Sequence, residues 1–200
     1  MIRILFTVLL CHFAIGLSLA QTYAEEVGAY RMSLIESMVS YTDHPPVQWK
    51  DTAHMDYYPL DTNLIINADF EPTVKDTFIK MPTTAGTEKI FKVLGRASFT
   101  VRDTMAQLTV YQPLKGSLMP YFFIPFKDGT SGVTTYGGGR YLEGPVPEDA
   151  ASSIKLDFNK AYNPWCVFNE GYYCPLPPVE NDIMPQIHAG EKNYLKDAHH

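Results

Sequence analysis

Short stretches that alternate polar with apolar residues follow one another through the middle of the chain, and this pattern limits the fold more than any other feature. They lie at residues 64–70, 77–80, 89–94, 97–101, 107–111 and 121–126. β-Branched and aromatic residues dominate them, as in strands with one buried face. Pro72, Gly86 and Gly95 separate them as turn residues. Because no helical pattern alternates with these strands, the sequence disfavours a parallel nucleotide-binding sheet and predicts an antiparallel meander that closes into a sandwich or a partly open barrel.

A helical pattern precedes the strands. Apolar side chains recur at alternating steps of four and three residues, at Tyr23, Val27, Tyr30, Leu34 and Met38. Further strands are predicted at residues 140–142, 154–158 and 184–187. The predicted fold is therefore α+β, mainly antiparallel β-sheet, with an N-terminal amphipathic helix and a long ordered C-terminal loop region.

The first twenty residues are typical of a secretory signal peptide. Arg3 gives a basic start, an apolar run extends to Leu19, and Ser18-Leu19-Ala20 offers a cleavage pattern before Gln21. The run is shorter than the roughly 20 residues that a membrane span needs. We expect an exported chain, periplasmic or extracellular, with a single domain over residues 21–200 and no membrane span after cleavage.

Charge and cysteine content narrow the possible partners. The formal net charge is −6 and lysine and arginine form no cluster, so we expect no nucleic-acid partner. Cys166 and Cys174 remain after export, and a disulfide between them would stabilise the fold by about 2–3 kcal/mol. Two free thiols are the alternative. Because no histidine lies between the cysteines, we expect neither a zinc site nor a cofactor.

The stretch from residue 156 to residue 181 is the best candidate for a functional site. It combines many aromatic rings with prolines and amides, which indicates an ordered loop over the end of the sheet. Three glycines at 137–139 precede Arg140 and form either a bulge, which we favour, or a close approach to a backbone or ligand. The candidate ligand-binding residues are Arg140, Tyr141, Asp157, Asn159, Tyr162, Asn163, Glu180 and Asn181.

These residues allow more than one interpretation. The Arg140 guanidinium could bind a carboxylate or phosphate, or it could pair with Asp157 or Glu180 and fasten the loop to the sheet. Asp157 and Asn159 begin like a calcium loop, but the later ligand positions do not match, so we expect them to cap turns.

Two of these residues and a later histidine could carry proton transfer. Asp157, Glu180 and His188 are the catalytic candidates, with Glu191 as a partner that orients His188. The sequence contains neither a G-x-S-x-G nor an H-E-x-x-H motif. A closed polar network is the alternative to catalysis.

Several motifs together resemble one family. They are Phe126–Gly132, Thr135–Leu142, Leu156–Pro164, Cys166, Cys174–Pro178, Glu180-Asn181 and Ala189–Lys192. This order is similar to the bacterial and archaeal domain-of-unknown-function family 1684 (DUF1684). The resemblance implies recurrent polar positions at Arg140, Asp157, Asn159, Asn163, Glu180, Asn181 and Glu191, but no activity.

Three functions follow as hypotheses. The first is a module that binds a small polar or anionic molecule with Arg140 and the 157–181 segment. The second is a hydrolase-like enzyme that uses a carboxylate or histidine. The third is a structural or interaction domain. An open pocket shared by Arg140, Asp157, Asn163 and Glu180 would favour the first two, whereas mutual pairing in a closed network would favour the third.

Overall fold

The computed structural model describes residues 2–41, 44–114, 119–148 and 151–195, with side chains from residue 21 onward. The chain divides into two compact units, Met1–Ser37 and Met38–His200. Helix α1 (Ile2–Val39) makes up nearly all of the first unit and runs without a break through the predicted signal peptide. Its side chains follow the predicted amphipathic pattern, with Val27 buried and Glu26 exposed. In the described part of the chain, no helix has both the length and the apolar character needed to cross a membrane.

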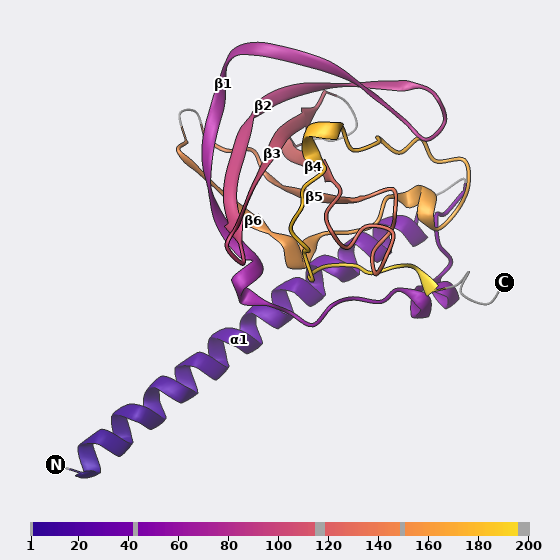
Figure 1. Cartoon of the computed structure of the whole chain (residues 1–200). Helices are drawn as coiled ribbons and strands as arrows, with labels where there is room; N and C mark the ends of the chain where they lie inside the picture. Colours follow the sequence, from indigo (N-terminus) through magenta and orange to yellow (C-terminus); the bar gives the residue numbers. More distant parts are fainter. Residues whose placement is uncertain (1, 42–43, 115–118, 149–150, 196–200) are drawn as a thin grey trace. The chain divides into compact units, whose positions relative to one another are not determined.

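The second unit is built on one antiparallel sheet. Its strand order is β5-β4-β3-β2-β1-β6, and Figure 1 shows the strands curling into a half-barrel. The strands are β1 (Ile65–Pro82), β2 (Glu88–Val101), β3 (Thr104–Pro113), β4 (Tyr121–Phe126), β5 (Arg140–Pro145) and β6 (Ser153–Asp157). The α+β fold is thus confirmed, and of the two predicted architectures the partly open barrel is the right one.

Long strands replace the short ones predicted for β1 and β2. The stretch at 64–70, apart from Leu64, and the stretch at 77–80 belong to β1, and those at 89–94 and 97–101 belong to β2. Gly95 therefore does not end a strand but sits at a register shift next to Val93. A Cβ on Gly95 would lie 2.4 Å from the Glu71 carbonyl oxygen and 2.6 Å from the Phe70 ring. The glycine is needed for close packing where the sheet bends.

Two other local predictions were wrong. The glycines at 137–139 form a turn before β5 and not a bulge, with the Gly139 N–H donating to the Tyr136 carbonyl at 3.0 Å. Gly139 has φ +93°, and a Cβ there would lie 2.5 Å from the Phe126 carbonyl oxygen, so the close approach is the correct alternative. Residues 184–187 form no strand, because their backbone follows the irregular C-terminal segment.

The two faces of the sheet carry separate apolar clusters. Strand alternation places Leu108, Ile124 and Leu156 in the larger cluster. The opposite face carries Phe91 and Phe123, stacked at a centroid distance of 5.4 Å in a smaller aromatic cluster. Both faces are therefore partly covered, and the loops that cover them determine which side chains stay accessible.

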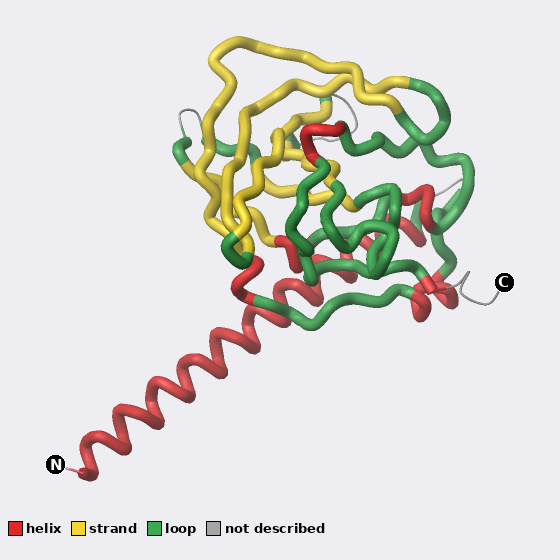
Figure 2. Tube along the Cα trace, viewed as in Figure 1, coloured by secondary structure: helices red, strands yellow, loops and turns green. Residues whose placement is uncertain are grey.

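Irregular segments with short 3-10 turns make up most of the rest of this unit (Figure 2). The turns are η1 (Trp49–His54), η2 (Thr62–Leu64), η3 (Phe158–Lys160), η4 (Trp165–Val167) and η5 (Val179–Asn181). In Figure 1 the segment with η5 lies inside the curve of β1 and β2. The predicted long ordered loop region is thus confirmed.

The amide of Asn181 joins η5 to the sheet. Within the described parts of β3 and β4, the ladder has one residue pair, Tyr111 with Phe123. Beyond that pair, Asn181 Nδ2 donates to the Thr109 carbonyl at 3.0 Å and to the Pro125 carbonyl at 2.9 Å, and its Oδ1 accepts from the Thr109 N–H at 2.7 Å. The side chain therefore supplies the hydrogen bonds that the strand ladder lacks there.

We expect Asn181→Ala to lower the free energy of unfolding by on the order of 3 kcal/mol, because it leaves buried backbone groups of β3 and β4 without partners. Urea unfolding followed by tryptophan fluorescence measures this loss. The matched control is Asn67→Ala, since Asn67 is exposed on β1 and its truncation should change stability by less than about 0.5 kcal/mol. Equal losses in the two variants would contradict the role of Asn181.

Candidate functional site

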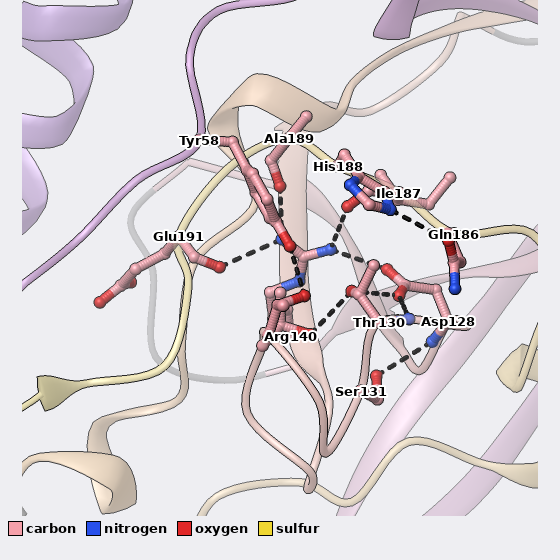
Figure 3. A network of polar contacts seen from close by, with 12 residues as sticks. Tyr58, Asp128, Thr130, Ser131, Arg140, Gln186, Ile187, His188, Ala189 and Glu191 are labelled. Carbon is pink, nitrogen blue, oxygen red and sulfur yellow. Dashed lines mark hydrogen bonds and ion pairs between the residues drawn. The ribbon is translucent and has the colours of Figure 1, made fainter. Parts of the chain in front are cut away.

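Arg140 lies at the centre of a closed polar network (Figure 3). Its side chain is 1% exposed, and Nη2 lies 2.7 Å from Asp128 Oδ2. Nη2 also donates to the Ile187 carbonyl at 3.0 Å, while Nη1 donates to the carbonyls of Glu191, at 3.1 Å, and Ala189. Burial lowers the pKa of Arg140 and the Asp128 carboxylate opposes that shift. The guanidinium faces the protein's own backbone, and its carboxylate partner is Asp128, not the predicted Asp157 or Glu180.

The amides predicted as ligand contacts bind the chain itself. Asn159 Nδ2 donates to the Asp61 carbonyl at 2.9 Å, and its Oδ1 accepts from the Asp61 N–H at the same distance. Asp157 Oδ1 accepts from the Asn159 N–H at 3.2 Å and so caps η3. The prediction that Asp157 caps a turn is confirmed.

Asn163 and Glu191 form a second fastening. The Asn163 N–H donates to Glu191 Oε2 at 2.9 Å, and Asn163 Nδ2 donates to the Lys192 carbonyl at 2.8 Å. The Glu191 carboxylate therefore points to Asn163 and does not orient His188. The His188 ring instead lies 3.1 Å from Gln186 Oε1 and 5.4 Å from the Tyr58 ring centroid.

The polar candidates therefore do not converge on one pocket. Arg140 contacts Asp128, Asp157 caps η3, and Asn163 binds the C-terminal segment. Among the predicted residues that the structure describes, Glu180 is the one that lines the cavity described next. Its position follows from its neighbour, because Asn181 fastens η5 to β3 and β4.

That cavity is a groove of about 650 Å³ on the face of β1, β2 and β3 that also carries the aromatic cluster. Its floor is ordered by strand register. Arg96 on β2 lies between Glu71 on β1 and Thr109 on β3. The next row toward the aromatic cluster contains Thr77, Val93 and Tyr111, and Ile79 follows. The remaining lining residues are Pro72, Thr73, Val74, Gln107 and Glu180. The groove thus changes from charged to apolar along its length.

A tyrosine–carboxylate pair forms part of the lining of the groove. Tyr111 is buried, and its hydroxyl donates to Glu180 Oε1 at 2.9 Å. Burial, followed by the nearby Glu180 carboxylate, raises the pKa of Tyr111. The hydroxyl therefore stays protonated and holds one carboxylate oxygen of Glu180 in place.

Glu143 on β5 is a titratable site that the sequence analysis missed. Its Oε1 accepts from the Tyr162 hydroxyl at 2.6 Å, and Tyr162 was a predicted ligand residue. Burial raises the pKa of Glu143 to about 7, and the hydrogen bond from Tyr162 opposes this shift. Burial followed by the charge of Glu143 also raises the pKa of Tyr121 to about 12. A single glutamate on an aromatic strand carries no sequence signal that marks such a site.

The remaining candidates lie near the aromatic cluster. The Tyr141 hydroxyl donates to the Pro175 carbonyl at 2.6 Å. Cys166 and Cys174 are free thiols here, and the Cys166 N–H donates to Cys174 Sγ. The disulfide between them stays a prediction. Among the described residues, no group of three or more histidine, cysteine, aspartate or glutamate side chains is placed to hold a metal ion.

Comparisons with known proteins match the chain at the levels of family and fold. The model of a family described as a protein of unknown function, DUF1684, matches residues 50–192. The chain is also similar to the solution NMR structure of an uncharacterized protein from Haloarcula marismortui, with a TM-score of 0.68 and 24% sequence identity over 88% of this chain and 97% of that one. At this identity the similarity supports the fold alone. No curated protein matches the chain.

Titration of Glu143 should make stability depend on pH. Because the pKa is raised from 4.5 to about 7 in the folded protein, the folded state binds the proton more tightly than the unfolded state. The free energy of unfolding of the wild-type protein, compared with that of Glu143→Gln, should be constant below pH 4.5. It should then fall by about 2–3 kcal/mol as the pH rises to 7.

Denaturant unfolding of both proteins at several pH values measures this difference. Glu88→Gln is the control, because Glu88 is exposed in an ion pair with Lys80 and should give a flat difference over the same range. A flat difference for Glu143→Gln as well would contradict the prediction.

Proposed function

The chain belongs to the DUF1684 family of proteins of unknown function, and from this premise we propose that it is a binding module that holds a small polar molecule in the groove of the curled sheet. The observation that carries the proposal is the groove itself, which combines charged side chains at one end with an apolar floor at the other. Its volume of about 650 Å³ falls within the range of about 300–1,000 Å³ that is usual for small-molecule sites.

The charges of the groove favour a ligand with a cationic group. Glu71 and Glu180 supply two carboxylates, whereas Arg96 is the arginine of the lining. The Tyr111 hydroxyl donates to one carboxylate oxygen of Glu180, Oε1, and an ammonium group is a strong partner for a carboxylate. The apolar part of such a molecule would lie against Ile79 and Val93. This replaces Arg140 with Glu180 as the residue that would contact the ligand.

The enzyme and structural alternatives each rest on a single local feature outside the groove. Glu143 has a pKa suited to proton transfer, but it is not among the residues that line the groove. The closed network around Arg140 agrees with a structural role for that part of the chain. A structural role for the whole domain would leave the charged groove without use.

A thermal-shift screen tests the binding proposal. Amines, carboxylic acids and neutral sugars would be compared, and an amine with an apolar part should raise stability by about 2.7 kcal/mol at 100 times its dissociation constant. Glu180→Gln should weaken that ligand roughly 10- to 100-fold, because it removes a charged hydrogen-bond partner. Glu88→Gln, a change of the same kind outside the groove, should bind like the wild type. No shift with any amine, or an unchanged affinity in Glu180→Gln, would refute the proposal.

We also infer export, on the basis of the N-terminal sequence. The basic start, the apolar run and the small residues before Gln21 favour cleavage by a signal peptidase. Expression in secreting cells should give a protein whose intact mass corresponds to a start near Gln21. Leu9→Arg should block processing, because a charge interrupts the apolar run. An uncleaved wild-type chain retained in the cytoplasm would count against export.

A further inference from the structure

Backbone hydrogen bonds fix the two chain segments that carry Cys166 and Cys174. The Cys166 N–H donates to Cys174 Sγ at 3.2 Å. Cys174 is bound to Thr84, two residues after the end of β1: its N–H donates to Thr84 Oγ1 at 3.2 Å and its carbonyl accepts from the Thr84 N–H at 3.0 Å. Cys166 lies in η4, whose Val167 N–H donates to the Pro164 carbonyl at 3.0 Å. The two sulfurs are therefore positioned by anchored backbone segments on either side of the loop.

The two thiols differ in exposure and in charge. Cys166 is partly exposed, whereas Cys174 is 6% exposed. The hydrogen bond from the Cys166 thiol lowers the pKa of Cys174, and the same bond raises the pKa of Cys166. The nearby Lys89 also lowers the pKa of Cys174. The lowered pKa of Cys174 favours its thiolate over that of Cys166, whereas Cys166 is the more exposed residue of the pair.

We propose that Cys166 and Cys174 form a reversible dithiol–disulfide site that reacts with low-molecular-weight disulfides by thiol–disulfide exchange. This site is independent of the groove. Cys166 would react first, because it is the more exposed cysteine, and Cys174 would then complete the exchange from within the protein. The pair would therefore be a redox site in which the two cysteines react in a defined order, and not a permanent structural disulfide.

The exchange balances in two steps. Cys166 Sγ attacks one sulfur of the small disulfide, its proton passes to Cys174 Sγ, and the first small thiolate leaves. That thiolate takes the proton from Cys174, whose thiolate then attacks Cys166 Sγ in the mixed disulfide. The second small thiolate leaves and takes a proton from water. Two electrons pass from the protein dithiol to the small disulfide, and one protein disulfide is formed.

Equilibration of the full chain with graded mixtures of reduced and oxidised glutathione tests this proposal. After acid quenching and alkylation, tryptic digestion places both cysteines in one peptide, residues 161–192, and Cys11 in another, residues 4–31. We expect the 161–192 peptide to pass from doubly alkylated to internally disulfide-bonded as the oxidised share rises, with its midpoint inside the series. Reduced glutathione should reverse the change.

Two outcomes of this titration would overturn the proposal. A peptide that stays doubly alkylated at every ratio would mean that the thiols do not exchange. A peptide that stays disulfide-bonded even in excess reduced glutathione would mean a permanent structural disulfide. Because the wild-type chain gives this answer, it does not depend on the folding of any variant.

Single serine variants test the order of reaction. Cys174→Ser should accumulate a glutathione mixed disulfide on Cys166, because the second sulfur is missing. Cys166→Ser should be modified at Cys174 at least tenfold more slowly, because that sulfur is buried. Denaturation in urea before oxidation is the control and should remove the difference between the two variants. Equal rates in the folded variants would refute the assigned order.

Discussion

The buried ion pair between Arg140 and Asp128 is the interaction on which the irregular half of the domain depends. A charge removed from water is costly unless it is paired and hydrogen-bonded. Here the guanidinium contacts one carboxylate and the carbonyls of Ile187, Ala189 and Glu191. It therefore fixes the C-terminal segment against the start of β5. Without this segment, Asn163 would lose Glu191 and Lys192 as partners.

Amide side chains extend the same principle over the rest of the loops. A buried irregular backbone cannot satisfy its own N–H and C=O groups, and a side chain that both donates and accepts can do so. The Asn159 side chain hydrogen-bonds both backbone groups of Asp61 in this way, and the Asn181 side chain hydrogen-bonds backbone groups of β3 and β4. The second case links the fastening to the candidate site, because η5 also carries Glu180. The groove thus receives its carboxylate from a turn that is held by the sheet itself.

Many of the polar residues predicted from the sequence are important to the structure, but they bind the protein's own chain and do not surround a shared pocket. Arg140 was expected to bind an anionic ligand or to pair with Asp157 or Glu180, yet its guanidinium contacts Asp128 and backbone carbonyls. The sequence pattern predicts a turn at Gly95, since glycine in a strand pattern marks either a turn or a tight bend, and the structure shows the bend. The groove was not anticipated, because Arg96 and Tyr111 are ordinary alternating residues of strands. Only the register across β1, β2 and β3 places Arg96 and Tyr111 in neighbouring rows on the same face of the sheet.

Local chemistry was enough to determine the class of fold, the amphipathic helix, the ordered loop and the cap formed by Asp157. Each of these depends on periodicity or on hydrogen bonds between near neighbours, which a sequence displays directly. The tertiary structure alone decided which polar groups are closed off and which remain at a cavity. Burial and pairing join residues far apart in the chain, such as Tyr111 with Glu180 and Arg140 with Ile187. No spacing in the sequence records those distances, because they arise from the curl of the sheet and the path of the loops across it.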